Sequence, residues 1–243
     1  MSSSFSVIAG SKRSLHVQVA REIARRILSG QLEQGQVIPG EMSLCEQFGI
    51  SRTALREAVK LLTSKGLLES KPKIGTKVLD RINWNFLDPQ LLEWMDGLQN
   101  SEVFFHQFLG LRKAIEPEAC ALAARHATAE QRIELSETFQ QMSEIADSFD
   151  QSRWAEVDMR FHRLIFLSTG NDFYLPFGNV LATIFMSFIH HSSKDGGVCI
   201  NEHRAIYDAI MAGNADKARQ ASQQLLQEEK HRLPSDVAKE KTV

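Results

Sequence analysis

The strongest restriction on the fold of this chain comes from a tight turn at residues 49–51, which separates two short helical patterns. Gly49 fits the left-handed position that often ends a helix. Ser51 fits the N-cap of a next helix, predicted over 52–64, because its hydroxyl can accept a hydrogen bond from a free backbone N–H. Two helices joined this closely predict a helix-turn-helix.

The flanking segments extend this pattern into a winged helix-turn-helix. Apolar residues at helical spacing predict a first helix over 15–28. Two short strands are predicted at 67–70 and 76–79, joined by a basic loop at 71–75. In such a unit the second helix of the pair, 52–64, presents its N-terminal side chains to base edges in the DNA major groove.

Charge is unevenly distributed along the chain. Residues 1–80 hold 12 Lys and Arg against 7 Asp and Glu, whereas the rest of the 243 residues hold 16 against 23. A basic segment suits a polyanion, because cations that neutralise phosphates release condensed counterions. The charge pattern therefore favours nucleic acid as the partner of the first 80 residues.

Side chains at the start of the predicted second helix suit DNA contacts. Arg52 and Arg56 are four residues apart, so they share one helical face, and Arg can bind guanine O6 and N7 through a bidentate fork. Ser51 and Thr53 carry short hydroxyl groups that suit phosphate or base contacts. The alternative is that both arginines form ordinary surface ion pairs, for instance with Glu57 or Glu69.

Four stretches of this region form one motif. They are I-P-G-E at 38–41, F-G-I-S-R-T-A-L-R-E-A at 48–58, G-L-L at 66–68 and G-T-K-V at 75–78. Together they closely resemble the DNA-binding domain of the GntR family of transcription regulators. The resemblance covers residues 14–79 almost continuously and places the DNA-binding domain over 14–80.

The resemblance implies particular DNA contacts. The wing around Gly75 is expected to reach the minor groove. Met42 stands where many members have Arg, which removes one expected contact. Lys73 replaces the usual first glycine of the wing, so Lys71 and Lys73 are expected to contact phosphates instead. Operator contacts are implied for four residues at the start of the second helix: Ser51, Arg52, Thr53 and Arg56.

Residues 81–100 are predicted to form a linker that contains a short helix. Its aromatic residues Trp84, Phe86 and Trp94 are interpreted as packing contacts between two domains rather than as a ligand site.

From residue 101 to 232 the pattern is helical throughout, with no long alternation of period two. This predicts a mainly α chain in which an antiparallel all-helical bundle follows the winged helix-turn-helix. Segments 1–13 and 233–243 are predicted to be tails. Helices are predicted near 101–126, 129–149, 151–169, 173–191, 200–212 and 214–232, around a core that includes Leu109, Leu111, Ile115, Ala119, Leu122, Phe161, Leu164, Ile165, Phe185, Phe188, Ile206 and Ile210.

Composition excludes several protein classes. No apolar run approaches the roughly 20 residues that span a bilayer, and the first ten residues lack the features of a signal peptide. Cys45, Cys120 and Cys199 are too far apart for a disulfide framework or a zinc finger, which favours reduced thiols. The expected location is the cytoplasm, without a membrane partner.

Several polar residues recur at core-facing positions of the predicted bundle. Asp158 and His162 are four residues apart on one helical face, and so are Arg112 and Glu116. His203 begins a later helix. A buried charge is costly unless it is paired or bound to a ligand, so the group as a whole favours a pocket for a small anion. Taken singly, each residue also fits a satisfied core or surface position.

Three stretches of this bundle form a second motif. They are L-R-K-A-I-E-P at 111–117, D-M-R-F-H at 158–162 and E-H-R-A-I at 202–206. They resemble the ligand-binding domain of the FadR subgroup of the GntR family, over about residues 100–232. The resemblance places an effector-binding and dimerisation domain over 101–232.

Members of this subgroup commonly hold a divalent metal with one Asp and three His. Asp158, His162 and His203 match three of these positions, whereas Leu225 stands at the fourth. The three matching residues could hold zinc or nickel, with an effector or water completing the coordination. Alternatively, they hydrogen-bond the hydroxyl groups of an effector directly.

The resemblance also implies the effector. Arg112 matches a position that often grips an effector carboxylate, for which a bidentate fork is suited. Glu116 is expected in the same effector site. The linker run W-N-F-L-D-P at 84–89 is similar to that of regulators that sense sugar acids such as galactonate. An aldonate, uronate or related hydroxy acid is therefore the expected effector.

These observations predict a ligand-responsive transcription regulator rather than an enzyme. The expected form is a homodimeric repressor that binds a palindromic operator, because a two-fold dimer matches an inverted repeat. One alternative is a metal-dependent hydrolase that uses Asp158, His162 and His203, although the chain lacks H-E-x-x-H and G-x-S-x-G. A purely architectural DNA-binding protein would leave the polar residues of the bundle unexplained.

Overall fold

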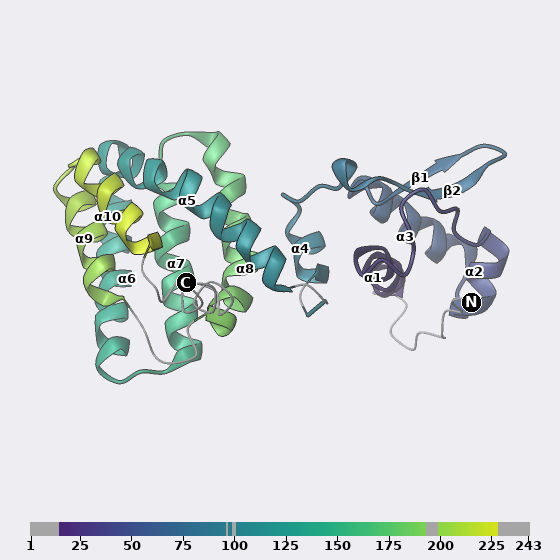
Figure 1. The fold of residues 1–243 in the computed structure, drawn as a ribbon, viewed down its shortest axis with the longest axis horizontal. Helices are drawn as coiled ribbons and strands as arrows, with labels where there is room; N and C mark the ends of the chain where they lie inside the picture. The colour runs from purple at the N-terminus through teal and green to yellow at the C-terminus, as the bar shows by residue number, and fades with distance from the viewer. Residues whose placement is uncertain (1–14, 96, 99–100, 193–198, 228–243) are drawn as a thin grey trace, which may run out of the picture. The chain divides into compact units, whose positions relative to one another are not determined.

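The computed structural model describes residues 15–95, 97–98, 101–192 and 199–227, with side chains described for all of these except 101–102 and 185–192. The chain divides into two compact units, Met1–Gln99 and Asn100–Val243 (Figure 1). Each unit has its own architecture.

The first unit is a helix-turn-helix with a two-stranded wing, as the sequence predicts. Val19, Ile23 and Phe48 are among the apolar residues of its closed core. Gly49 has φ 66° and ends the second helix in the left-handed conformation, so the turn forms as expected. The elements are α1 (Leu15–Leu28), α2 (Glu41–Phe48), α3 (Arg52–Ser64), β1 (Leu68–Lys71) and β2 (Gly75–Val78).

The wing is an antiparallel hairpin in which Leu68 pairs with Val78 and Lys71 pairs with Gly75. Both strands are displaced by one residue from their predicted bounds. The strands pair up to Lys71 and Gly75, so a short turn joins them, and this turn contains a residue in the left-handed conformation. That residue is Lys73, with φ 64°, and the backbone of a residue with a Cβ atom is strained in this conformation. This strain explains why a glycine is expected at Lys73.

The linker packs against the first unit. It forms η1 (Arg81–Asn83) and α4 (Pro89–Met95), and Trp84 and Trp94 belong to the same hydrophobic core as α1. This differs from the prediction of packing between two domains. The physical reason is that the core of a domain this small needs additional apolar area, which the two indole rings supply.

A buried ion pair between Lys65 and Asp88 joins this linker to the end of α3. Lys65, the C-cap residue of α3, is 3% exposed, and its Nζ lies 2.7 and 2.8 Å from the two carboxylate oxygens of Asp88. The same ammonium group lies 5.2 Å from the centre of the Trp94 ring. Asp88 Oδ1 also accepts the backbone N–H of Leu91 at the start of α4. One carboxylate thus both pairs with Lys65 and caps the linker helix.

The second unit is all-helical among its described residues. α5 packs against α7, α9 and α10, α6 packs against α7 and α9, and α8 packs against α7 (Figure 1). Thr128 and Gln131 form a capping box at the start of α6. Its elements are α5 (Ser101–His126), α6 (Ala129–Asp147), α7 (Gln151–Leu167), η2 (Asp172–Tyr174), α8 (Leu175–Ser192), α9 (Ile200–Met211) and α10 (Ala215–Gln227).

The buried face of α5 differs from the expected one. Leu111, Ile115 and Leu122 are half-buried rather than core residues, because α5 turns Arg112 and Glu116 inward instead. The other predicted core positions with described side chains are buried: Leu109, Ala119, Phe161, Leu164, Ile165, Ile206 and Ile210. The side chains of Phe185 and Phe188 lie outside the described residues.

Among the described residues, no helix has both the length and the apolar character needed to cross a membrane.

Gly66, which follows α3, gives a direct test of the linker packing. It has φ 73°, and a Cβ at this position would lie 1.9 Å from the carbonyl oxygen of Asn83. Gly30 has a similar φ of 79°, but a Cβ there would meet no atom within 4 Å. We expect Gly30→Ala to cost about 1–2 kcal/mol, the penalty of the left-handed conformation alone. Gly66→Ala should cost more than twice as much, because the linker backbone must also move.

Urea unfolding of the two variants, followed by circular dichroism, measures the difference. Equal losses for the two variants would contradict the close packing of the linker on the end of α3.

Candidate functional site

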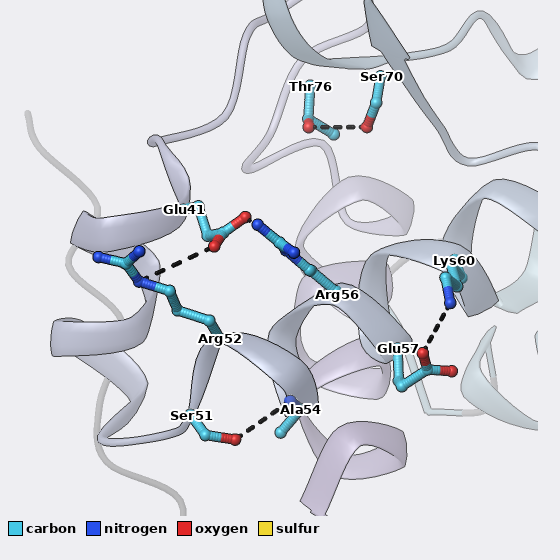
Figure 2. A network of polar contacts seen from close by, with 9 residues as sticks. All are labelled: Glu41, Ser51, Arg52, Ala54, Arg56, Glu57, Lys60, Ser70 and Thr76. Atoms are coloured by element: carbon cyan, nitrogen blue, oxygen red, sulfur yellow. Dashed lines mark hydrogen bonds and ion pairs between the residues drawn. The ribbon is translucent and has the colours of Figure 1, made fainter.

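The N-terminus of α3 presents a polar surface (Figure 2). Ser51 accepts a hydrogen bond from the backbone N–H of Ala54 at 3.2 Å, so its hydroxyl caps the helix as predicted. The side chains of Arg52, Thr53 and Arg56 are exposed. The four residues expected at the start of this helix therefore lie together on the surface.

Glu41, the first residue of α2, contacts both arginines. Its Oε2 accepts a hydrogen bond from Arg56 Nε at 3.0 Å, and its Oε1 lies 4.0 Å from Arg52 Nε (Figure 2). This hydrogen bond raises the pKa of Arg56 above its ordinary value. Because the contacts use Nε, they leave the two terminal nitrogens of each guanidinium for a further bidentate acceptor. Glu41 can therefore orient both arginines without occupying their forks.

Sequence reasoning missed this role of Glu41. It suggested Glu57 as an ion-pair partner of the arginines, but Glu57 pairs with Lys60 at 2.8 Å, and this hydrogen bond lowers the pKa of Glu57. The feature of the sequence that could have indicated this role is Glu41 itself, the last residue of the I-P-G-E stretch. The Glu41 side chain lies close to Arg56, 15 residues later in the sequence, only because of the way α2 packs against α3.

The wing carries exposed basic residues. Lys71 and Lys73 are exposed, and Lys71 Nζ lies 3.0 Å from the carboxylate of Glu69 on the same strand. Gly75 has φ 107° and begins β2 directly after the turn. Across the hairpin, the hydroxyl groups of Ser70 and Thr76 are 2.9 Å apart (Figure 2). The wing residues expected from the sequence are thus on the surface.

A second polar cluster is buried inside the helical unit. Asp158 and His162 project from α7, and His203 projects from α9. All three are at most 2% exposed, and one ligand atom from each lies within 4.8 Å of the others. Residues separated by more than 40 positions in the sequence therefore converge as predicted.

The hydrogen bond of His203 defines which of its nitrogens can act as a ligand. Its Nδ1 lies 2.8 Å from the carbonyl oxygen of Cys199, which can only accept, so Nδ1 carries the proton. In the neutral ring Nε2 then has a lone pair. This Nε2 lies 2.9 Å from Asp158 Oδ1, which also has only lone pairs. A proton or a metal ion between the two atoms would make the contact favourable.

Arg112 and Glu116 of α5 extend the cluster. Arg112 donates to Glu116 through Nε at 2.5 Å and through Nη2 at 3.2 Å. The other side of Glu116 meets His162, whose Nδ1 lies 3.2 Å from Oε2. His162 Nε2 in turn lies 3.4 Å from Asp158 Oδ1. The five ionisable residues expected from the sequence form one continuous buried network.

Electrostatics within the network favour the charged carboxylates. Burial by itself would raise the pKa of Glu116, but Arg112 and His162 outweigh it and lower the pKa to about 2. Burial opposes ionisation of Asp158 in the same way, and the two histidines hold its pKa well below the usual range. The pKa of His162 is raised, because the carboxylates outweigh the effect of burial on the ring.

Two buried residues of α10, Ser222 and Leu225, bear on which side chains could complete the site. Leu225 is fully buried, so the fourth position expected for a ligand is apolar here. Ser222, one turn earlier, is buried and lies beside the Cys120 thiol of α5, whose pKa burial raises to about 12. Sequence reasoning did not single out Ser222. Its only signal is its place among the small residues that pack α10 against α5.

Three ligands of this kind suit a transition metal. Two neutral imidazoles and one carboxylate match the donor preferences of zinc and nickel. The opposed lone pairs of His203 Nε2 and Asp158 Oδ1 also call for a cation between them. Asp158, His162 and His203 could therefore hold a metal ion.

Comparison with protein families identifies both units. The model of the bacterial regulatory proteins of the gntR family matches residues 15–78, and the FCD domain model matches residues 107–228. The chain belongs to the GntR family. The FCD match covers the helical unit that contains the buried network.

Curated relatives of this GntR-family protein are regulators. The HTH-type transcriptional regulator YieP of Escherichia coli K12 is 40% identical over 215 residues, which cover 88% of this chain and 94% of YieP. The galactonate operon transcriptional repressor of the same organism is 26% identical over 87% of this chain and 93% of the repressor. The similarity to the galactonate repressor, expected from the linker, is therefore weaker over the whole chain than that to YieP.

Solved structures support the fold. A protein described as Lar, which controls expression of the Listeria monocytogenes agr system, has a TM-score of 0.59 at 17% identity, with coverage of 89% of this chain and 95% of that one. A GntR protein of Streptococcus agalactiae has a TM-score of 0.50 at 20% identity, with coverage of 89% and 100%.

The family assignment defines the general activity. The protein is a DNA-binding transcription regulator with an FCD domain, and it is not an enzyme. The hydrolase alternative for Asp158, His162 and His203 is accordingly set aside.

The ion pair of Arg112 and Glu116 should be important for stability. Arg112→Met would leave the Glu116 carboxylate buried without its bidentate partner, which should cost about 3 kcal/mol. Arg219→Met is the control, because Arg219 is partly exposed and its carboxylate partners, Glu118 and Asp216, can return to water. Its loss should be markedly smaller.

Chemical unfolding of both variants measures these losses. Similar losses for the two arginines would contradict the idea that burial makes the Arg112 pair costly to break.

Proposed function

We propose that this protein is an effector-responsive repressor that binds a palindromic operator as a homodimer and is released by a small carboxylate, such as a sugar acid. The observation that carries the proposal is the buried network around Asp158 in the FCD unit. An architectural bundle would gain stability from apolar side chains at these positions. The presence of five buried ionisable groups is explained by the binding of a charged ligand.

The DNA contacts are assigned to the exposed face of α3 and to the wing. Arg52 and Arg56 would read guanine through their terminal nitrogens, held in place by Glu41. The remaining contacts would fix the protein on the sugar-phosphate backbone and do not specify sequence. They are assigned to Ser51 and Thr53 of the helix-turn-helix and to Lys71, Lys73 and Gly75 of the wing.

The effector site is assigned to the buried network. Asp158, His162 and His203 would hold zinc or nickel, and the metal would supply a cationic centre to which an effector carboxylate binds. Because Leu225 offers no ligand, a coordination position would be left for that carboxylate. Arg112 is buried in the same network and would attract the anion electrostatically. Without a metal, the Nε2 lone pairs of the two histidines would instead accept hydrogen bonds from effector hydroxyl groups.

A sugar acid is supported by two observations. The linker run W-N-F-L-D-P at 84–89 is similar to that of sugar-acid regulators. A relative named as the galactonate operon repressor matches 87% of the chain. Aldonates and uronates combine a carboxylate with several hydroxyl groups, which the ionised and imidazole side chains of the network can bind.

Release from DNA requires that the effector prefer one state of the dimer. A dimer whose recognition helices no longer match the half-site spacing would lose operator affinity. The effector shifts the protein to this state only if it binds that state more tightly, with a typical coupling of about 1–3 kcal/mol.

Titration of operator DNA with acids tests this function. In fluorescence anisotropy with DNA from the region upstream of its own gene, we expect galactonate or a related acid to weaken binding by about 5- to 150-fold. Galactose is the control, because it is a polyhydroxylated sugar without a carboxylate and should have no effect. Removal of metal with a chelator should abolish the response, and added zinc or nickel should restore it.

Each negative outcome identifies a different error. Absence of operator binding at low salt would contradict the regulator itself. A response to galactose equal to that to galactonate would contradict the carboxylate effector, and a response unaffected by chelator would contradict the metal.

Glu41 should contribute to sequence discrimination. Glu41→Ala would free Arg52 and Arg56 from their common partner, so specific operator affinity should fall by about tenfold. Affinity for unrelated DNA should stay equal or rise, because a negative charge near phosphate is lost. Glu46→Ala makes the same change of charge at an exposed position of the same helix and is the control.

The measured quantity is the ratio of specific to non-specific affinity at fixed salt concentration. An equal ratio in wild type, Glu41→Ala and Glu46→Ala would show that Glu41 has no orienting role.

A further inference from the structure

Both carboxylate oxygens of Glu116 already have partners within the protein. Oε1 accepts from Arg112 Nε at 2.5 Å, and Oε2 accepts from Arg112 Nη2 at 3.2 Å and lies 3.2 Å from His162 Nδ1. The side chain is only 1% exposed. Glu116 therefore lies behind Arg112 and His162, and it is poorly suited to contact an effector directly, although the sequence suggests such a contact.

The contact with Glu116 determines the form of the His162 ring. An ionised carboxylate can only accept, so the proton of the neutral ring is held on Nδ1. The lone pair is then on Nε2, which lies 3.4 Å from Asp158 Oδ1. His203 is held in the same form, but by the backbone carbonyl of Cys199. Both rings thus direct Nε2 toward the same carboxylate oxygen.

We propose that Glu116 is a positioning residue, which holds His162 with Nε2 toward Asp158 and thereby prepares the three-residue site for a metal ion. This rests on the metal centre proposed above. A carboxylate behind a metal-binding histidine orients the ring and increases its basicity. Glu116 is the described side chain that does this for His162, whereas the equivalent group for His203 belongs to the backbone.

Charge gives a second reason for a carboxylate at this position. Arg112 and Glu116 together are neutral, and Asp158 adds one negative charge. Histidines that bind a metal are neutral, so a divalent ion leaves the site with one net positive charge. One effector carboxylate would neutralise it. A neutral side chain in place of Glu116 would leave the positive charge of Arg112 uncompensated, and this charge would repel the metal.

The affinity of the protein for zinc and nickel tests this role. Competition with a chromophoric chelator should show that Glu116→Gln binds each metal about 10- to 100-fold more weakly than wild type, with correspondingly larger dissociation constants. Glu118→Gln is the matched control, because Glu118 lies on the same helix but pairs with Arg219 at 2.8 Å outside the network. Its affinity should equal that of wild type.

Two further variants separate positioning from folding. Arg112→Gln removes the guanidinium but keeps the Glu116 side chain beside His162, so it should bind metal more tightly than Glu116→Gln. The double variant Arg112→Gln/Glu116→Gln removes both charges of the pair, so it should fold. It should still bind metal more weakly than wild type, because His162 has lost the carboxylate behind its ring. Circular dichroism and thermal unfolding establish that each variant is folded before its affinity is measured.

Nuclear magnetic resonance gives a readout that a purely structural role would not change. In metal-free wild type, at a pH above the raised pKa of His162 where the ring is neutral, the ¹⁵N shifts of the ring should show the proton on Nδ1. In folded Glu116→Gln or the double variant, a substantial share of the rings should carry it on Nε2.

The outcomes are distinct. Wild-type affinity and an unchanged His162 ring in the folded variants would overturn the positioning role while leaving the metal centre intact. Failure of wild type itself to bind zinc or nickel would overturn both the metal centre and this inference. Operator binding, measured on the same preparations, would still test the regulator separately.

Discussion

Inside the FCD unit, an ionised carboxylate removed from water is strongly unfavourable unless cations or donors surround it. Glu116 and Asp158 meet this requirement through Arg112, His162 and His203, and every other feature of the buried network follows from it. The network ties together α5, α7 and α9, so the chemistry of the site and the packing of the bundle depend on the same contacts. A change of charge in this network would therefore act directly on the helices that surround it.

The DNA-binding unit uses carboxylates in a different way. Glu41 contacts the Nε atoms of two exposed arginines, and solvent screens these pairs, so they contribute orientation rather than stability. Asp88, in contrast, pairs with the buried ammonium of Lys65 and caps α4. The end of the recognition helix and the start of the linker are thereby held by one side chain. The linker consequently belongs structurally to the DNA-binding unit.

Local patterns predicted most of the fold. Gly49 and Ser51 mark the turn because left-handed φ and N-capping are properties of single residues, and the helices of the bundle follow from the spacing of apolar residues. The positions of Asp158 and His162 four residues apart were likewise enough to place them on one face. Errors arose where another element decides the outcome. Which face of α5 is buried depends on α7, α9 and α10, and the partner of Arg56 depends on α2.

The sequence by itself determined the order of the elements, the helix-turn-helix and the family, since each depends on local spacing or on a recognisable motif. It also predicted the residues of both candidate sites. Only the tertiary structure decided which atoms of those residues meet. It turned Glu116 toward Arg112 and His162, set His203 Nδ1 on the Cys199 carbonyl, and brought Glu41 to the arginines of α3. The physical reason is that hydrogen bonds and ion pairs act over about 3 Å, a distance that depends on how separate helices pack and not on any spacing along the chain.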